Sequence, residues 1–367
     1  MKVLVFSKEF YPSGGGTGVV AKQICDYIKE TGHDVSVLTS SPSSYEIETL
    51  HVNCLPGFWP FCFSLKCKFD DYDLIILNDP VAIYIAGLVF SKSEYEKSIA
   101  ILHGSEPEFV YKNSNLKNRI YCWKFFFTKG LQNAGHIFSH GNYMKTKIDP
   151  FITRNCYKKI KPVYFGYDEK LFFREDRCFD FRANFNLQDC DEVILTVSRV
   201  DEKKGFNNKL NIFEKLINEG LSLSWFIIGD GPYLTQLKSM VNLKGLQHRV
   251  FFLGKVDRSL LRNYYSGADL FWLLSNYEES FGLVYIEAQA TGVPVIGRKK
   301  AGVRESIKDS VSGFLVENDE QVEAILRQKK YKLLNKSDIV NFAEGFSNFG
   351  TFNKALRDII GLYKTSR

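Results

Sequence analysis

The chain has 367 residues, 45% of them hydrophobic and 25% charged, with a formal net charge of +6 at pH 7. This balance is typical of a globular protein of about two domains, and it excludes a disordered chain. No uncharged apolar stretch reaches the roughly 18 residues of a membrane-spanning helix.

The N-terminus begins with an apolar run, Val3–Phe6, and Glu9 interrupts anything that resembles a signal peptide. The eight cysteines are scattered, with no Cys-x-x-Cys pair, so we expect small buried hydrophobes and neither a zinc site nor a disulfide framework. Both observations predict a cytoplasmic protein.

The first third of the chain alternates short apolar runs with a helical pattern. Residues 19–31 have helical spacing and end before Gly32, a good C-cap. This βαβ order predicts a parallel sheet. The predicted buried strands are Val3–Phe6, Val35–Leu38, Leu74–Leu77 and Ile99–Leu102.

Residues 166–190 lack periodicity and are interpreted as a linker, after which the same rhythm restarts. We therefore predict an α/β protein with two doubly wound, Rossmann-like domains, 1–165 and 166–348, and a C-terminal helix within 349–367. The second set of strands is predicted at Val193–Val197, Leu223–Ile228, Val250–Leu253, Leu270–Leu274 and Val293–Ile296. Its helices are predicted at Leu210–Glu219, Tyr233–Leu243, Ser259–Ser266, Leu283–Thr291 and about Phe352–Tyr363.

Ligands of open parallel sheets bind beyond the carboxyl ends of the strands, so the loops there are the candidate sites. A glycine-rich loop, residues 13–18 with Gly15 and Gly16, follows the first strand and precedes a helix, where phosphate is favoured. The glycine spacing is not that of a dinucleotide fold, and no Walker lysine follows. A flexible turn is the alternative interpretation.

Arg199 and Lys204 follow the first strand of the second domain, where both side chains could reach one diphosphate. A solvated charged loop is the alternative. Further on, Ser280 is a candidate N-cap for a helix that carries Glu287, with Glu279 just before it. A carboxylate is a natural acceptor for ribose hydroxyls, although an acidic helix N-terminus that complements the dipole would explain these residues too.

These loops, in this order, resemble those of the retaining glycosyltransferases of family 4, which have the GT-B fold. The resemblance covers nearly the whole chain and includes Gly229-Asp230-Gly231-Pro232 and the Glu-x7-Glu signature at Glu279 and Glu287. It implies two domains that face a central cleft, with the C-terminal helix crossing back to the first domain. Phe165 and Leu274 depart from the family's usual Asn and Pro, which affects linker and loop geometry only.

The resemblance also implies residue roles. Arg199 and Lys204 would clamp the donor diphosphate, and Glu287 would hold the ribose. The transferred sugar would contact Glu279 and the backbone amides of Phe281, Gly282 and Leu283. Gly15, Gly16 and Gly229 would line the substrate site, and His103 matches the family's active-site histidine, although a lone histidine is more often structural.

The implied reaction is metal-independent transfer with retention at the anomeric carbon. Arg199, Lys204 and helix N-termini would stabilise the departing diphosphate, so we expect no metal and no cofactor. Glu279 is expected to position the sugar rather than to act as a covalent nucleophile.

The basic excess is confined to one region. Residues 112–161 hold eleven basic residues and one acidic residue, a net +10, so the rest of the chain nets −4 of the total +6. Within it, cations alternate with rings, as in an interfacial helix, and Leu55–Phe69 has a similar composition. Packing of these rings into the domain core is the alternative, and nucleic acid is not expected because no nucleic-acid module accompanies them. The expected face for membrane and acceptor comprises Lys112, Lys117, Arg119, Trp123 and Lys124.

We therefore expect a hexosyltransferase that moves a hexose or N-acetylhexosamine from a UDP- or GDP-linked donor. The expected acceptor is a lipid-linked glycan, carried on a polyprenyl diphosphate, in surface-polysaccharide (O-antigen or capsule) synthesis at the inner face of the membrane. The alternative is an inactive nucleotide-binding regulatory or scaffold protein of the same fold. A nicotinamide dehydrogenase is disfavoured by the glycine spacing.

Overall fold

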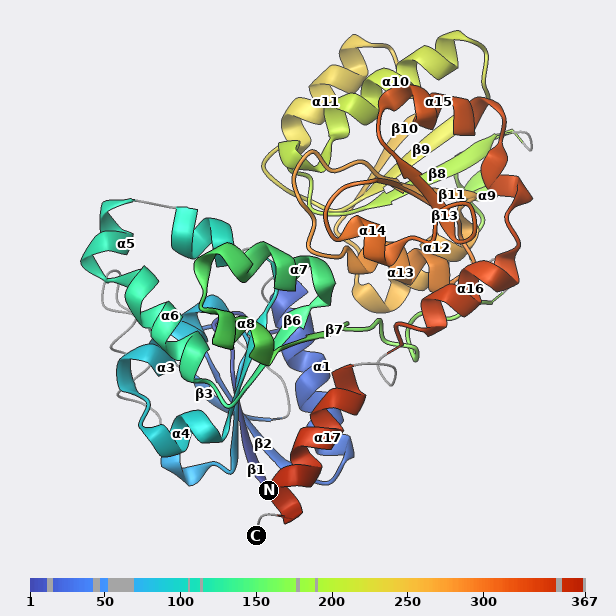
Figure 1. Ribbon diagram of the computed structural model, residues 1–367. Helices are drawn as coiled ribbons and strands as arrows, with labels where there is room; N and C mark the ends of the chain where they lie inside the picture. Colours follow the sequence, from blue (N-terminus) through green and yellow to red (C-terminus); the bar gives the residue numbers. More distant parts are fainter. Residues whose placement is uncertain are drawn as a thin grey trace. The chain divides into compact units, whose positions relative to one another are not determined.

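The computed structural model describes residues 1–11, 16–41, 47–51, 69–104, 106–112, 115–175, 179–188, 191–347 and 352–365, with the backbone alone at 51, 117 and 362–365. The chain forms two compact units, an N-terminal unit of residues 1–164 and a C-terminal unit of residues 165–367 (Figure 1). Each unit has a parallel sheet of its own.

The N-terminal unit has, in its described part, a seven-stranded sheet in the order β3-β2-β1-β4-β5-β6-β7. Every pairing is parallel, and β1, β4 and β5 are apolar along most of their length because helices cover both faces of such a sheet. The chain reverses its direction of winding between β1 and β4, which places a switch point there. The strands are β1 (Lys2–Phe6), β2 (Asp34–Thr39), β3 (Glu48–His51), β4 (Leu74–Leu77), β5 (Ser98–Leu102), β6 (His136–His140) and β7 (Ile160–Val163).

Helices of this unit pack closely where glycines allow it. A Cβ atom on Gly87 would lie 1.8 Å from the Phe126 carbonyl oxygen, and one on Gly130 would lie 2.1 Å from the Ile83 carbonyl oxygen. These glycines therefore let α3 and α6 cross in backbone contact. The helices are α1 (Gly16–Glu30), α3 (Pro80–Val89), α4 (Lys92–Glu96), α5 (Leu116–Ile120), α6 (Trp123–Asn133), α7 (Gly141–Ile148) and α8 (Arg154–Lys159).

The C-terminal unit has, within the described residues, a six-stranded sheet in the order β10-β9-β8-β11-β12-β13, again with parallel pairings. Its core is centred on Trp225 and Trp272, which are fully buried in an edge-to-face pair with 5.3 Å between ring centroids. The strands are β8 (Glu192–Val197), β9 (Leu223–Ile228), β10 (Val250–Gly254), β11 (Leu270–Leu273), β12 (Val295–Arg298) and β13 (Gly313–Val316).

The helices of this unit follow the strands in alternation, as a doubly wound fold requires. They are α9 (Phe181–Phe185), α10 (Phe206–Asn218), α11 (Leu234–Leu243), α12 (Leu261–Gly267), α13 (Leu283–Ala290), α14 (Val303–Ser306), α15 (Asp319–Arg327), α16 (Lys336–Glu344) and α17 (Phe352–Thr365). Short 3-10 turns precede three of them, η4 (Glu202–Lys204), η5 (Arg258–Leu260) and η6 (Lys330–Leu333).

The predicted fold of two Rossmann-like parallel-sheet domains is confirmed. The interpretation of residues 166–190 as plain linker is wrong in part, because Asp180 caps a short helix, α9, and Phe172 and Phe181 are fully buried. By its contacts α17 belongs to the C-terminal unit, and Phe352 at its start packs on Phe165 at 4.9 Å between ring centroids. The packing of the C-terminal helix on the first domain stays a prediction.

Candidate functional site

Two loops meet at the carboxyl edge of the C-terminal sheet, one after β8 and one after β11. Gly205 ends the first with a φ of +68°, and a Cβ atom there would lie 1.9 Å from the Leu274 carbonyl oxygen. The Asn276 amide donates to the Lys203 carbonyl oxygen at 2.8 Å. A residue other than glycine at 205 would push the two loops apart, so this glycine sets the spacing of the charged groups that they carry.

Those groups form a closed ring around Glu279. Its Oε1 accepts from Lys204 Nζ at 2.7 Å and from Ser275 Oγ at 2.5 Å, and its Oε2 accepts from the Tyr277 hydroxyl at 2.7 Å. Lys204 Nζ also donates to the Tyr277 oxygen at 2.9 Å. Burial disfavours the charged form of Lys204, but Glu279 and Tyr277 outweigh it and raise the lysine pKa. Lys204 is therefore a fixed cation.

Arg199, in the same loop, is different. Its side chain is exposed, and among the described residues it makes no ion pair. An arginine without a carboxylate partner beside a fixed lysine is suited to bind an anion in a forked geometry. The structure thus brings Lys204 and Glu279 together and leaves Arg199 available beside them on the loop.

Glu287 does not join that ring. It is 1% exposed in α13, where Oε1 forms an ion pair with Arg258 of η5 and Oε2 lies 3.4 Å from the Tyr265 hydroxyl. Arg258 stacks over Phe172, with 5.2 Å from the guanidinium carbon to the ring centroid. Sequence reasoning missed Arg258, because nothing in the sequence relates it to a carboxylate 29 residues away.

The start of α13 also differs from the prediction. Ser280 is not the N-cap, because the helix begins at Leu283 with Gly282 as its cap at a φ of +87°. No side chain caps this end among the described residues, so its first amides are not used by a capping group. The Phe281 ring is fully buried, so this residue has only its backbone to offer to a ligand.

The glycines of the site lie as follows. Gly229 follows β9 with a φ of +133°, and a Cβ there would lie 1.9 Å from the Ser198 carbonyl oxygen, so it spaces the loops after β8 and β9. Gly16 is the exposed first residue of α1 in the N-terminal unit. Gly15 lies outside the described residues.

A buried polar cluster lies at the carboxyl edge of the N-terminal sheet, near its switch point. The Asn78 side chain, fully buried at the end of β4, donates from Nδ2 to Ser7 Oγ at 3.0 Å and to the Thr17 carbonyl oxygen at 3.1 Å. Its Oδ1 therefore faces His103 Nε2, 3.2 Å away. Because that oxygen only accepts, His103 is assigned the tautomer with the proton on Nε2.

Burial lowers the pKa of His103 to about 4, so its ring is neutral at pH 7. The fully buried Glu106 carboxylate fixes the backbone here by accepting from the amides of His103 and Gly104, each at 2.6 Å. Burial, with a smaller contribution from His103, lowers the pKa of His140 at the end of β6 to about 3. Sequence reasoning missed Asn78, although its place directly after the buried run Leu74–Leu77 was a usable signal.

The basic face of the N-terminal unit is only partly as expected. Trp123 is 3% exposed and packs on Tyr84 at 4.3 Å between ring centroids, so its expected surface position is wrong. Lys112 forms an ion pair with Glu108 at 3.1 Å. The Lys117 side chain lies outside the described atoms, as does nearly all of the aromatic stretch Leu55–Phe69.

Arg119 and Lys124 are exposed and, among the described residues, make no ion pair. With Lys129 they line a groove of about 850 Å³ on α5 and α6, whose largest exposed ring is Phe125, 64% exposed. The lining holds no carboxylate. No described helix is both long enough and apolar enough to cross a bilayer.

Comparison with known proteins finds similarity to glycosyltransferases. Residues 179–345 match the model of the glycosyl transferases group 1. The N-acetyl-alpha-D-glucosaminyl L-malate synthase of Bacillus anthracis is 27% identical over 327 residues, 84% of this chain and 82% of that protein. The alpha-monoglucosyldiacylglycerol synthase of Streptococcus pneumoniae is 20% identical over 332 residues, 86% of this chain and 75% of that protein.

Among solved structures, HepE of Anabaena in complex with UDP-glucose superposes with a TM-score of 0.78, at 19% identity and over 100% of both chains. This likeness confirms the GT-B fold that the sequence predicted. The matched residues 179–345 contain the whole Arg199–Glu287 region. The surface-polysaccharide specialisation is not part of the match.

Proposed function

We propose that this chain, whose residues 179–345 match the group 1 glycosyl transferases, transfers a hexose or N-acetylhexosamine from a UDP-sugar to a lipid-linked glycan. The proposed transfer retains the configuration at the anomeric carbon. The observation that carries the proposal is the Lys204–Glu279–Tyr277 ring with Arg199 unpaired beside it. Anions fit a site whose cations are held in advance, because no reorganisation is then needed as charge develops. The UDP donor is supported by the HepE complex.

In the proposed reaction the bond between the anomeric carbon and the diphosphate oxygen breaks, and the bond to the acceptor oxygen forms on the same face. The acceptor hydroxyl loses its proton to the departing diphosphate. Arg199 and Lys204 stabilise the negative charge that develops on the leaving diphosphate. Glu279 and the uncapped amides at Leu283 and Val284 of α13 hold the sugar hydroxyls, and Glu287, kept in place by Arg258, accepts from the ribose. His103 contacts the transferred sugar as a neutral group.

The lipid-linked acceptor, of the kind used in O-antigen or capsule synthesis, is a further part of the proposal. Its support is the groove on α5 and α6, in which the unpaired cations Arg119, Lys124 and Lys129 border the exposed Phe125. Such a surface fits an amphiphile with a phosphate head, at the inner face of the membrane. A relative named for a diacylglycerol product agrees with a lipid acceptor.

The catalytic part is tested by turnover of UDP-sugars with Glu279→Gln and Tyr277→Phe beside the wild type. We expect Glu279→Gln to lose at least about 100-fold in kcat/KM. A folded Glu279→Gln variant with wild-type kcat/KM would refute the site. UDP binding without transfer of any sugar would favour the inactive alternative.

The membrane part is tested by co-sedimentation with vesicles that contain anionic lipid. The variant Arg119→Glu with Lys124→Glu should lose binding, whereas Lys92→Glu, on the exposed surface of α4, should keep most of it. Equal binding by both variants would refute the assignment of this face.

A further inference from the structure

A buried lysine lies near enough to the proposed donor site for the charges of Lys204 and Glu279 to act on it. Lys209, in the first turn of α10, is 0% exposed, and its Nζ has no hydrogen-bond partner among the residues that the structure describes. The amine lies over the Phe206 ring, 4.0 Å from its centroid, and 5.5 Å from that of Trp225. A buried amine without a partner is unfavourable for stability, so its presence needs an explanation.

The charged groups that act on Lys209 are those of the Glu279 ring. Burial lowers the pKa of Lys209 well below its ordinary value, and the positive charge of Lys204 lowers it further, while Glu279 opposes both. Lys204 precedes α10 by two residues, and Glu279 belongs to the loop after β11. Burial is thus the main cause of the lowered pKa of Lys209, and the charges of Lys204 and Glu279 act on that pKa in opposite directions, so a new charge at the site would shift it.

We propose that Lys209 is a positioning residue of the donor site that takes up a proton from solvent when a nucleoside diphosphate binds beside Arg199 and Lys204. The proposal rests on the proposed function for the identity of the ligand. The diphosphate offsets the charge of Lys204, and the faces of Phe206 and Trp225 stabilise the new ammonium by cation–π attraction. The site thus gains a cation that is absent while it is empty.

This coupling has a definite sign. The pKa of Lys209 is lower in the free protein than in the complex, so binding takes up protons at pH values between the two. UDP affinity then falls as pH rises through that window, by at most about tenfold per pH unit for one proton. Above and below the window this slope vanishes.

The experiment is calorimetric titration with UDP from about pH 6 to about pH 9, in two buffers of different ionisation enthalpy, which together give the protons taken up. The variant Lys209→Met keeps the length of the side chain without its amine. The matched control is Lys238→Met, an exposed lysine in α11 that lies over Phe252 at 5.5 Å. We expect a pH-dependent uptake of up to about one proton in the wild type and the control, and its loss in Lys209→Met.

An uptake that is unchanged in Lys209→Met would overturn the proposal. A second measurement is independent of nucleotide: the Cε resonance of Lys209, assigned by its absence in Lys209→Met, should titrate at lower pH than the ordinary lysine pKa of about 10.4. A Lys209 that titrates near that ordinary value would overturn the proposal even if UDP binds. If the pKa of Lys209 is lowered in a protein that binds no UDP, the result would support the neutral amine and count against the proposed function instead.

Discussion

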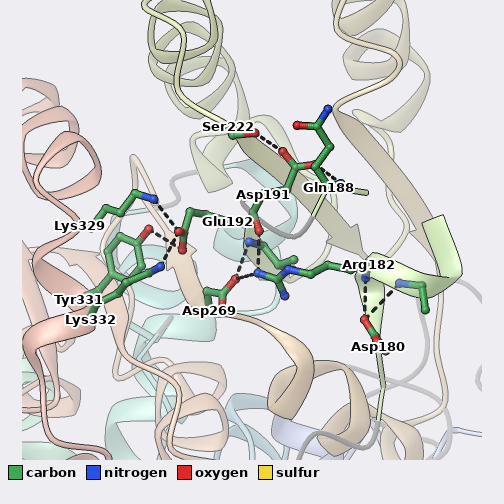
Figure 2. Close-up of polar contacts among 12 residues, drawn as sticks. Asp180, Arg182, Gln188, Asp191, Glu192, Ser222, Asp269, Lys329, Tyr331 and Lys332 are labelled. Carbon is green, nitrogen blue, oxygen red and sulfur yellow. Dashed lines mark hydrogen bonds and ion pairs between the residues drawn. The ribbon is translucent and has the colours of Figure 1, made fainter. Parts of the chain in front are cut away.

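The two edges of the C-terminal sheet use the same kinds of charged residues in opposite ways. At the amino edge, Glu192 accepts from Lys329 Nζ at 2.8 Å, Lys332 Nζ at 2.6 Å and the Tyr331 hydroxyl at 3.1 Å (Figure 2). Asp191 pairs with Arg249 at 2.7 Å, and Asp269 pairs with Arg182 at 2.8 Å, in the same group of polar contacts. Each of these three carboxylates has its cation.

At the carboxyl edge the balance is incomplete. Glu279 is satisfied by Lys204, Tyr277 and Ser275, but Arg199 has no ion pair and Lys209 no hydrogen-bond partner among the described residues. Complete pairing leaves no charge for a ligand, whereas an arginine without an ion pair and a buried amine that can take up a proton both favour an anionic ligand. This difference agrees with the proposed function, in which the carboxyl edge binds the donor and the amino edge contributes to stability.

The largest effect that this comparison predicts is on activity. Replacing Lys204 with Met removes the fixed cation and leaves Glu279 without its ion pair, so kcat/KM should fall by about 100- to 1000-fold, or about 3–4 kcal/mol. The control is Lys203→Met, the exposed neighbour in the same turn, which should stay within about threefold of the wild type. Equal losses in both variants would contradict the specific role of Lys204.

The next effect is on stability at the amino edge. Glu192→Gln removes the charge that Lys329 and Lys332 share, but both lysines are about half exposed and can turn to water. The free energy of unfolding, measured with urea, should fall by about 1–3 kcal/mol, with UDP affinity unchanged. Glu320→Gln, at an exposed carboxylate, should change it by less than about 0.5 kcal/mol. A loss of UDP affinity in Glu192→Gln would contradict the separate roles of the two edges of the sheet.

A smaller change in the free energy of unfolding, of opposite sign, is expected for Lys209→Met. Lys209→Met removes a buried amine without a partner, so the free energy of unfolding should rise by about 1 kcal/mol. Urea unfolding at pH 7 measures it, beside Lys238→Met as control. A clear destabilisation by Lys209→Met would show that the amine is satisfied in the folded protein.

The smallest effect is on acid stability. Burial opposes ionisation of Asp191, but hydrogen bonds from Ser222 and Arg249 outweigh it and lower its pKa below the ordinary 3.8. The unfolded chain therefore binds the proton first, and the stabilisation, complete above pH 3.8, is lost as pH falls towards the lowered pKa. In Asp191→Asn the free energy of unfolding, measured with urea at several pH values, should fall less steeply in acid than in the wild type. An unchanged dependence on pH would contradict this role of Asp191.

Much of the fold could be predicted from the sequence because buried parallel strands are apolar throughout. Leu74–Leu77 and Leu223–Ile228 were predicted with the bounds that the structure gives. Strands β3, β6, β7 and β13 were missed, and two of them carry a visibly weaker signal: β6 includes His136 and Ser139, and β7 contains Pro162. In these segments pairing with neighbouring strands decides the structure, and the local pattern does not reveal it.

The site was predictable in its loops but not in its pairings. Lys204 and Glu279 are 75 residues apart, and their contact depends on the close approach at Gly205, which no local pattern shows. Trp123 was misplaced for a related reason, since composition does not tell which face of α6 meets Tyr84. Gly282, with its positive φ, starts α13 in place of the better capping residue Ser280, so backbone geometry overrides side-chain preference there.

The central claim, that the carboxyl edge of the C-terminal sheet binds a nucleoside diphosphate, is tested most directly by calorimetric titration with UDP, GDP and NAD. The account predicts that UDP binds the wild type and that Lys204→Met weakens this binding by at least about tenfold. Binding of NAD alone, binding of none of the three, or unchanged UDP affinity in a folded Lys204→Met variant would contradict it.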